Sequence, residues 1–336
     1  MSASQYRLFD LIQSHRITQL VYVAAKLGIA EALRQAPRPA DELAAQLNVN
    51  ADALRRLLTA LVTIDVCERR SDGRYAISET GSLLDGTSAS SLRSWAIFET
   101  EMIATNWQSL LDTVKTGLTP AQRAGASSSF ELMARSPERI AIFNAAMADL
   151  TRSVTPALLR AYDFSRISHL MDVGGGAGEF VAEAAQRHPR LRATVFDLAR
   201  CEAAALQRLE EAGVNERVSF VAGDFFRAIP AASDTILMKS VIHDWDDERS
   251  VQILRNCRAA LPKDGTLLLV ERVVADCPST SDDDRSNAMS DLNMMCGPGG
   301  RERTRCEYER LLTTSGFRLE AVHAAGRFSA IEARPA

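Results

Sequence analysis

Several features are missing from this sequence, and each absence narrows the class of protein. No apolar run approaches the roughly 20 residues that a membrane-spanning helix requires. Residues 1–10 lack the basic stretch followed by an apolar stretch that marks a secretory signal. The six cysteines are scattered, with no CxxC pair and no metal-site spacing. We therefore expect a cytoplasmic protein with reduced thiols and no disulfide framework.

An excess of charge of one sign is also lacking. The net charge is -4 at pH 7, and the isoelectric point is about 5.8. This balance gives no general attraction to nucleic acid or to an anionic membrane. Internal repeats and low-complexity tracts are absent as well. The chain has 336 residues, of which 46% are hydrophobic, and this length exceeds what one core usually spans. We therefore expect more than one domain.

The first part of the chain has a helical pattern followed by a short hairpin. Residues 39–58 contain two short amphipathic patterns separated by a turn at residues 48–50. A polar hairpin with a turn at residues 71–73 comes next. Two helices around a turn and then a hairpin are the outline of a winged helix.

A winged helix permits two interpretations. A transcription regulator would read DNA with the second helix and contact phosphates with nearby arginines, here Arg55, Arg56, Arg69, Arg70 and Arg74. Acidic residues alternate with these arginines, and a continuous basic face is what such binding depends on. The other interpretation is a domain that packs against a partner chain.

The residues before the winged helix are rich in apolar side chains. The apolar positions are Leu8, Leu11, Ile12, Ile17, Leu20, Val21 and Val23. A segment of this composition has little chain of its own to cover it, so it predicts burial against a second copy in a homodimer. The alternative is that it folds back on the rest of its own chain.

Beyond residue 168 the pattern changes to short apolar runs that alternate with longer amphipathic stretches. The predicted strands are residues 169–173, 192–197, 218–221, 235–239 and 266–271. Strands and helices in alternation predict an α/β fold with a doubly wound, Rossmann-like, mostly parallel sheet. Ligands of such sheets bind outside the carboxyl ends of the strands.

The first of these strands runs into a glycine-rich loop with glycines at 174, 176 and 178. Glycine allows a tight turn and a close approach of the backbone to a ligand. A nicotinamide dinucleotide is one candidate ligand, but Glu179 stands where the GxGxxG motif has its third glycine. A carboxylate at a helix N-terminus also occupies the position that a pyrophosphate needs. S-adenosylmethionine carries a sulfonium and an ammonium group and no phosphate, so it fits this loop better.

Acidic and aromatic residues at the next strand ends suit that cofactor. Asp197 ends the second strand, where a carboxylate accepts both ribose hydroxyls in dinucleotide-binding folds. The alternative role for Asp197 is a helix N-cap. Asp224 follows the third strand and is placed to bind the adenine amino group, and Phe225 is placed to cover the adenine ring.

His243 follows the fourth strand and is the candidate for chemistry. A phenol has a pKa of about 10, so a base must take its proton as the oxygen attacks a methyl group. Glu271, at the end of the fifth strand, and Glu302 are candidates to orient and stabilise that histidine. A lone histidine is more often structural, and its place after the cofactor loop is what favours catalysis. No metal site is expected, because the strand ends carry no cluster of three carboxylates, and the acidic run at residues 244–247 is expected to open the next helix.

Five motifs in order resemble the caffeic-acid-type small-molecule O-methyltransferases, a family of plant phenolic enzymes and bacterial secondary-metabolite enzymes. The motifs lie at residues 172–178, 196–198, 223–226, 238–245 and 299–304. The resemblance covers essentially the whole chain. It implies a winged-helix dimerisation domain at 1–95, a helical connector that lines the substrate pocket at 96–160, and a cofactor-binding catalytic domain at 161–336.

The resemblance also implies specific roles for residues. The implied cofactor contacts are Gly174, Asp197, Asp224, Phe225 and Lys239. The implied base is His243, with Glu271 and Glu302 beside it, and the implied substrate-pocket residues are Phe143, Met147 and Met294. Without the resemblance, these last three would be assigned to the core, since apolar residues at helical spacing usually are. Phe225 and Ser240 depart from the commoner residues of the family, and the segment before Gly299 is one residue short.

The sequence therefore predicts transfer of a methyl group from S-adenosylmethionine to a hydroxyl of a small aromatic or polyketide-like metabolite. One alternative is an N-methyltransferase of a heteroaromatic metabolite on the same scaffold. A more remote alternative is a winged-helix DNA-binding regulator with a ligand-sensing domain. The expected partners are a small-molecule acceptor and a second copy of the chain, without nucleic acid or membrane.

Overall fold

The computed structural model describes residues 2–336, which form two compact units. The first unit runs to Thr105 and includes Glu138–Leu150, and the second comprises Asn106–Pro137 and Thr151–Ala336. The long helix α12, Pro137–Ala161, contributes residues to both units. Among residues 2–336, no helix combines the length and the apolar character needed to cross a membrane.

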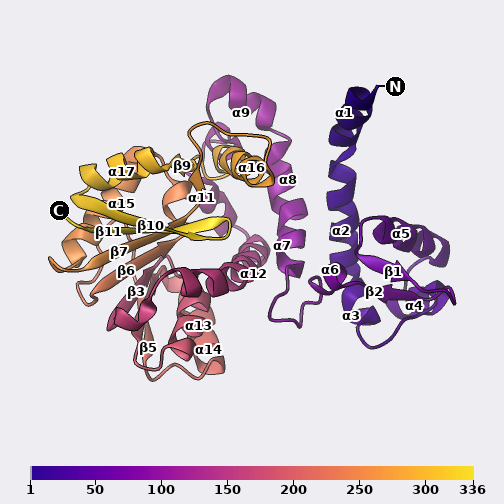
Figure 1. Cartoon of the computed structure of the whole chain (residues 1–336), viewed down its shortest axis with the longest axis horizontal. Helices are drawn as coiled ribbons and strands as arrows, with labels where there is room; N and C mark the ends of the chain where they lie inside the picture. Colours follow the sequence, from indigo (N-terminus) through magenta and orange to yellow (C-terminus); the bar gives the residue numbers. More distant parts are fainter. Residues whose placement is uncertain (1) are drawn as a thin grey trace. The chain divides into compact units, whose positions relative to one another are not determined.

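The first unit contains the predicted helix–turn–helix and hairpin (Figure 1). Asn48 ends the first of the two helices in the helix–turn–helix and has the left-handed conformation, with φ at 54°. Asn50 then caps the second helix by accepting the N–H of Ala53 at 2.9 Å. The elements are α1 (Ala3–Gln13), α2 (His15–Leu27), α3 (Ile29–Leu33), α4 (Ala40–Leu47), α5 (Ala51–Thr63), β1 (Cys67–Arg69), β2 (Tyr75–Ile77), α6 (Glu79–Ser82), α7 (Arg93–Phe98) and the π-helix η1 (Glu99–Ile103).

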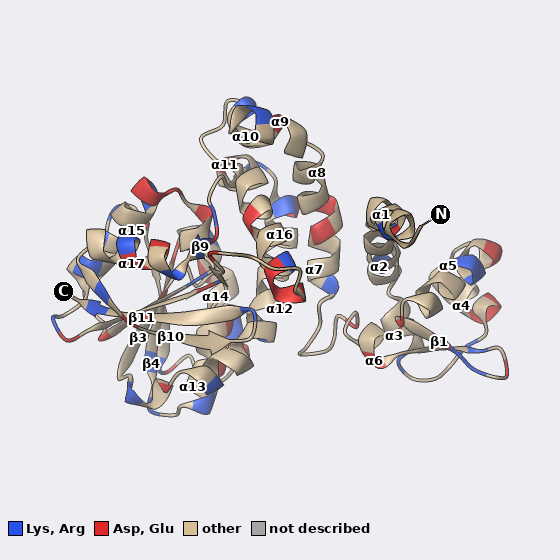
Figure 2. Ribbon diagram, turned by 45° about the horizontal axis from the view of Figure 1, so that its top comes forward, with Lys and Arg blue, Asp and Glu red and all other residues tan. Residues whose placement is uncertain are grey.

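Acidic residues lie on α4, and residues of both charges lie on α5 and β1 (Figure 2). Arg55 pairs with Asp41 at 2.6 Å, and Arg70 lies 3.4 Å from Glu68. These pairs involve exposed side chains and contribute little to stability. They do interrupt the basic face that binding to DNA phosphates would need.

Helix α1 carries a set of exposed apolar side chains. Its residues Leu8, Leu11 and Ile12 are 59%, 56% and 64% exposed, although side chains of this kind are usually covered. Tyr6, Phe9 and Ile17 are exposed to a similar extent. Leu20 and Val21, further along in α2, pack instead against the buried core of the first unit.

The second unit is built on a seven-stranded sheet with the order β10-β11-β7-β6-β3-β4-β5. The strands are β3 (His169–Val173), β4 (Arg192–Asp197), β5 (Val218–Ala222), β6 (Thr235–Lys239), β7 (Thr266–Glu271), β10 (Phe317–Ala325) and β11 (Phe328–Pro335). The five strands from β3 to β7 pair in parallel, as predicted, and β11 joins β7 antiparallel. The chain reverses direction across the sheet between β3 and β6, and this switch point is where doubly wound folds bind ligands.

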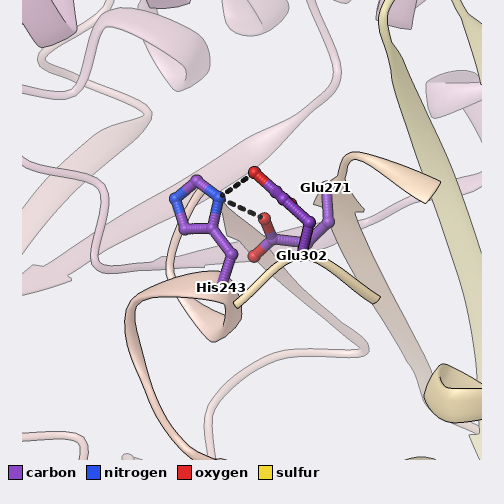
Figure 3. A group of neighbouring side chains, drawn as sticks. All are labelled: His243, Glu271 and Glu302. Atoms are coloured by element: carbon purple, nitrogen blue, oxygen red, sulfur yellow. Dashed lines mark hydrogen bonds and ion pairs between the residues drawn. The ribbon is translucent and has the colours of Figure 1, made fainter. Parts of the chain in front are cut away.

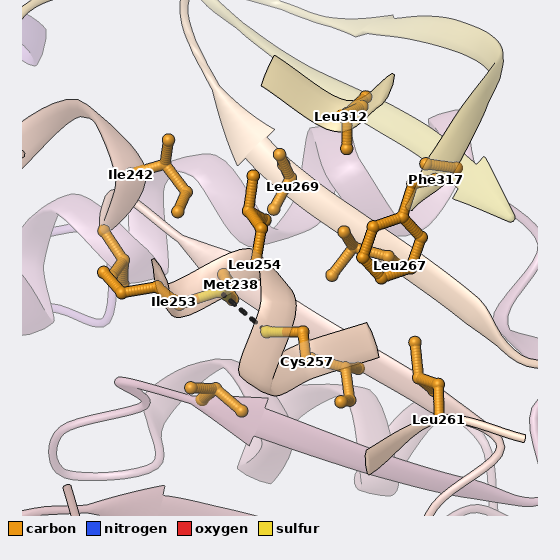
Figure 4. Packing of buried hydrophobic residues seen from close by; sticks show 14 of the residues in the cluster. Met238, Ile242, Ile253, Leu254, Cys257, Leu261, Leu267, Leu269, Leu312 and Phe317 are labelled. Atoms are coloured by element: carbon orange, nitrogen blue, oxygen red, sulfur yellow. Dashed lines mark hydrogen bonds between the residues drawn. The ribbon is translucent and has the colours of Figure 1, made fainter. Parts of the chain in front are cut away.

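Helices cover both faces of this sheet, with α13 (Glu179–Arg187) and α14 (Glu202–Glu211) on one face and α15 (Asp247–Ala260) and α17 (Arg305–Thr314) on the other (Figure 1). On the second face, Ile253, Leu254 and Cys257 of α15 pack on strand residues such as Leu267 and Leu269 (Figure 4). All of these side chains are fully buried. This packing fixes the strand ends at which the site residues lie.

The remaining elements of the second unit are short or lie around the sheet. They are α9 (Leu110–Thr116), α10 (Pro120–Arg123), α11 (Ser129–Ala134), η2 (Phe164–Arg166), η3 (Ala199–Cys201), η4 (Ile242–Asp244), β8 (Val273–Val274), α16 (Asp282–Cys296) and β9 (Arg303–Thr304). Helix α8, Ala104–Trp107, spans the boundary between the units.

Candidate active site

The glycine-rich loop follows β3 and opens α13. Gly174 and Gly178 have φ values of 77° and 75°, a conformation that residues with a side chain rarely adopt. A Cβ on Gly174 would lie 2.8 Å from a methyl carbon of Val241, and one on Gly178 would lie 3.2 Å from a methyl carbon of Val195. The glycines are therefore required both for the turn and for the close approach of the loop to its neighbours.

Asp197, at the end of β4, is bonded to this loop. Its Oδ2 accepts the N–H of Gly176 at 2.8 Å, and its Oδ1 accepts the N–H of Leu198 at 2.6 Å. It caps no long helix, since α14 begins after Cys201. A carboxylate has about four acceptor positions, so Asp197 keeps capacity for a ligand while it holds the loop.

Glu179 occupies the N-terminus of α13, directly after the loop. Its two oxygens pair with Arg152 and Arg208, each at 2.8 Å. A phosphate would need the same helix terminus. The loop therefore suits a ligand without phosphate, and the sulfonium and ammonium of S-adenosylmethionine meet this condition. Neither arginine was predicted from the sequence, in which they lie 27 and 29 positions away from Glu179.

The residues that follow β5 lie beside the loop. The Cε1 atom of Phe225 is 3.9 Å from the position that a Cβ on Gly174 would take. The Phe225 ring also meets the ring of Trp245 edge-on, with centroids 6.3 Å apart. Asp224 accepts the N–H of Phe226 at 2.9 Å, which fixes this turn. Trp245 was not singled out from the sequence, although its position two residues after His243 is a possible signal.

Lys239 ends β6, Asp172 is the residue before the last of β3, and the charge of each affects the pKa of the other. Burial raises the pKa of Asp172 to about 7, against the opposing effect of the Lys239 charge. Burial likewise lowers the pKa of Lys239. The next residue, Ser240, has φ at 55°, so the chain leaves β6 through a left-handed turn.

This turn carries His243, and hydrogen bonds to Glu271 fix the backbone of the turn. Oε1 of Glu271 accepts the N–H groups of Val241 and Ile242 at 3.0 and 2.8 Å. Glu271 is the last residue of β7, the strand next to β6. The carboxylate therefore fixes the backbone immediately before the histidine.

The side chains of His243, Glu271 and Glu302 meet, as Figure 3 shows. Nδ1 of His243 lies 3.2 Å from Oε1 of Glu302 and 3.5 Å from Oε2 of Glu271. The same Glu302 oxygen accepts the hydroxyl of Ser290 at 2.7 Å. Nε2 is on the other edge of the ring, 3.7 Å from Oδ1 of Asp244. Both acids named from the sequence thus face one ring nitrogen, and the other nitrogen is directed away from them.

The charges of this group determine the basicity of the histidine. Burial by itself would lower the pKa of His243, but the negative charges of Glu271 and Glu302 outweigh it and raise the pKa to about 10. Burial raises the pKa of Glu271. For Glu302 burial is outweighed by the His243 charge, so its pKa is lowered. The two carboxylates therefore make the imidazole a stronger base than a free histidine side chain.

The same three side chains are the group of possible metal ligands found among residues 2–336, with ligand atoms within 4.8 Å of one another. The run at residues 244–247 does not converge on one point. Asp246 caps α15 by accepting the N–H of Arg249 at 2.8 Å, and Asp247 pairs with Arg303 at 2.7 Å. Residues 246 and 247 thus open the next helix, as the sequence indicated.

The residues named for the substrate pocket lie in both units. Met294, in α16 of the second unit, is buried, with 9% of its surface exposed. Phe143 and Met147 lie on the part of α12 that belongs to the first unit. The Phe143 ring meets that of Phe98 edge-on, with centroids 5.8 Å apart. A common role for these three residues stays a prediction.

Comparison with known proteins agrees with this geometry. A model of the O-methyltransferase domain matches residues 107–318, and a model of the O-methyltransferase dimerisation domain matches residues 3–85. The chain belongs to the O-methyltransferase family. It is an enzyme, and its cofactor is S-adenosylmethionine. The dimerisation-domain match replaces the DNA-binding interpretation of the winged helix, and the predicted fold class is confirmed.

Individual relatives of this O-methyltransferase match over nearly their full length. The phenazine O-methyltransferase PhzM of Lysobacter antibioticus is 38% identical over 98% of this chain and 95% of its own. The crystal structure of LaPhzM superposes with a TM-score of 0.92 at 37% identity and covers 100% of both chains. The N,N-8-amino-8-demethyl-D-riboflavin dimethyltransferase RosA of Streptomyces davawensis has a TM-score of 0.81 at 27% identity, again over 100% of both chains.

Proposed function

We propose that this enzyme methylates a hydroxyl of a small aromatic or polyketide-like metabolite and that His243 is the general base. The observation that carries the proposal is the orientation of the His243 ring. Nδ1 faces two buried carboxylates, at 3.2 and 3.5 Å, and Nε2 is directed away from both. The 38% identity to a phenazine O-methyltransferase supports an aromatic acceptor.

S-adenosylmethionine supplies an electrophilic methyl group on its sulfonium. The acceptor oxygen would form its bond to the methyl carbon as the carbon–sulfur bond breaks, so that S-adenosylhomocysteine leaves with the electron pair of that bond, and the hydroxyl proton would pass to Nε2 of His243. The ring then carries a positive charge, and Glu302 and Glu271 stabilise it through Nδ1. The charge arises beside the two carboxylates, so their stabilisation is greatest in the transition state, where it accelerates the reaction.

The cofactor roles follow from the positions of the strand ends. We assign the ribose hydroxyls to Asp197, the adenine amino group to Asp224 and the adenine face to Phe225. Gly174 would contact the cofactor through its backbone, because a Cβ there would lie only 2.8 Å from a methyl carbon of Val241. Lys239 lies at the end of β6 and completes this group.

We divide the chain into three functional segments, with boundaries after residues 95 and 160. Residues 1–95 would form the dimerisation domain, and residues 161–336 would bind the cofactor and carry the catalytic residues. Residues 96–160 would line the acceptor pocket with Phe143 and Met147, together with Met294 from the last part. The exposed apolar residues of α1 support a homodimer, because a second copy would cover them.

Methylation of nitrogen is the second candidate, because RosA is a dimethyltransferase of an amino group. A neutral amine has a lone pair available without loss of a proton, so it needs no base before the attack. For such an acceptor, the carboxylates of Glu271 and Glu302 beside His243 would not be needed in the chemical step. The presence of both carboxylates beside His243 favours a hydroxyl acceptor.

The test is a pair of matched acceptors, a phenol and the aniline with the same ring system, in the presence of isotope-labelled S-adenosylmethionine. We expect label on the phenol oxygen and loss of that product in His243→Ala. Label on the aniline nitrogen alone, unaffected by His243→Ala, would overturn the proposal.

A further inference from the structure

We propose that Arg303 is a positioning residue for the methyl transfer. Its guanidinium holds the backbone turn that carries His243 in the position at which the imidazole contacts Glu302. The inference rests on the proposed role of His243 as the base. Arg303 itself touches neither the imidazole ring nor a ligand position, and it acts through the turn.

The guanidinium of Arg303 is among the most completely buried side chains, with 1% of its surface exposed. Nη1 donates to the carbonyl of Ile242 at 3.2 Å, and Nη2 donates to the carbonyl of Trp245 at 2.9 Å. Nε and Nη2 both donate to Oδ1 of Asp247, at 3.0 and 2.7 Å. One side chain therefore binds the backbone on both sides of His243.

The residues just before Arg303 bind the same turn. The N–H of Arg301 donates to the carbonyl of His243 at 2.9 Å. A Cβ on Gly300 would lie 2.0 Å from that carbonyl oxygen, so only glycine permits the contact. Glu302 lies within this segment and faces Nδ1 of His243. Residues 300–303 thus fix the backbone of the turn and also supply a charge to its side chain.

The guanidinium suits this task because it is planar and presents donors in a fixed fork. A lysine would keep the positive charge but would lose the fork that reaches two carbonyls and a carboxylate together. A small movement of the turn would change the contact between His243 and Glu302, and catalytic groups tolerate little such movement. The cofactor residues at the ends of β3 and β4 would stay in place, since Arg303 bonds to none of them.

The experiment compares Arg303→Lys with Arg305→Lys, an exposed arginine two residues further on. The measurements are kcat, KM for S-adenosylmethionine, binding of S-adenosylhomocysteine by calorimetry, and the pH dependence of kcat/KM. For Arg303→Lys we expect kcat to fall about tenfold or more, cofactor binding to stay within about twofold, and the rising limb of the pH profile to move to lower pH. Arg305→Lys should match the parent in every measurement.

Two further variants test the inference if Arg303→Lys does not fold. Asp247→Ala removes the carboxylate that anchors the guanidinium and should shift the same parameters in the same direction, by less. Added guanidinium, but not ethylammonium, should restore part of the kcat of Arg303→Ala. The inference would be overturned if Arg303→Lys kept the kcat and pH profile of the parent. It would also be overturned if Arg303→Lys lost kcat and cofactor binding to the same degree. In both cases His243→Ala would stay inactive. Full activity of His243→Ala would instead overturn the proposed function.

Discussion

Nδ1 of His243 lies 3.2 Å from Oε1 of Glu302, which is 59 positions further along the chain. Glu271 approaches the same nitrogen from β7 at 3.5 Å. The ring is therefore held by one edge, and a proton can be exchanged at the other. The two carboxylates raise the pKa of the imidazole, which makes it a better proton acceptor.

Replacement of His243 by alanine should reduce kcat by about 10²- to 10⁴-fold, the usual contribution of a positioned base. Affinity for S-adenosylmethionine should change little, because the histidine acts mainly in the transition state. Steady-state kinetics and calorimetry on His243→Ala check both points, with His323→Ala on β10 as the control. Retention of full activity would mean an acceptor that is already ionised or a nitrogen acceptor.

Replacement of Glu302 by glutamine should move the pH profile toward acid. The carboxylate charge raises the pKa of His243, and the base acts in its deprotonated form, so kcat/KM of the parent rises with pH through this pKa. Loss of the charge lowers the pKa, so the rising limb should shift to lower pH by about 1 unit or more, and the plateau should be lower. A shift toward higher pH, or none, would contradict the assigned role.

Replacement of Asp197 by alanine should weaken binding of S-adenosylhomocysteine about tenfold or more. The variant leaves the N–H of Gly176 and the ribose hydroxyls without their acceptor, at a cost of about 1–3 kcal/mol. Calorimetry on Asp197→Ala measures this, and Asp276→Ala in an exposed segment is the control. Parent-like affinity would remove Asp197 from the cofactor site.

Removal of divalent metal should leave activity unchanged. Asp246 and Asp247 are engaged by α15 and by Arg303, so they do not form the oxygen-rich site that magnesium prefers. The group around His243 offers an imidazole, which suits other metals better. Methyl transfer is measured before and after EDTA treatment. Loss of activity with EDTA and recovery with magnesium would establish a metal requirement.

The protein should be a dimer at nanomolar concentration. Obligate interfaces commonly bury about 2,000 Å² or more and resist dilution. Light scattering should give twice the chain mass of 36.7 kDa. Ile12→Arg, which places a charge on the exposed face of α1, should lower that mass. A single-chain mass at micromolar concentration with activity intact would rule out the dimer as the active species.

Much of the second unit was predictable from sequence, because buried parallel strands are continuous apolar runs. The bounds of β3, β4, β6 and β7 agree with the predicted ranges, and β5 extends one residue further. The hairpin of β10 and β11 was missed. Its residues are only partly buried over much of their length, so their apolar pattern is weak, and Gly326 at its turn is the one local signal.

The site was predictable to the extent that its residues lie in short motifs. The structure brings together His243, Glu271 and Glu302, which the motif order had singled out. The arginines that neutralise Glu179 were not predictable, because each comes from a distant helix and leaves no periodic pattern. The hydrogen bonds of Arg303 to the His243 turn were also not predictable from the sequence, because they join segments about 60 residues apart.

The separation between the His243 turn and residues 300–303 has a consequence for synthesis on the ribosome. The cofactor loop, Asp197 and Asp224 are all translated before residue 243, and the partners of the turn emerge about 60 residues later. A nascent chain halted between these points would hold the residues proposed to bind the cofactor but would lack the segment proposed to position the base. The proposed base therefore gains the hydrogen bonds that fix its turn only after residue 303 has been translated.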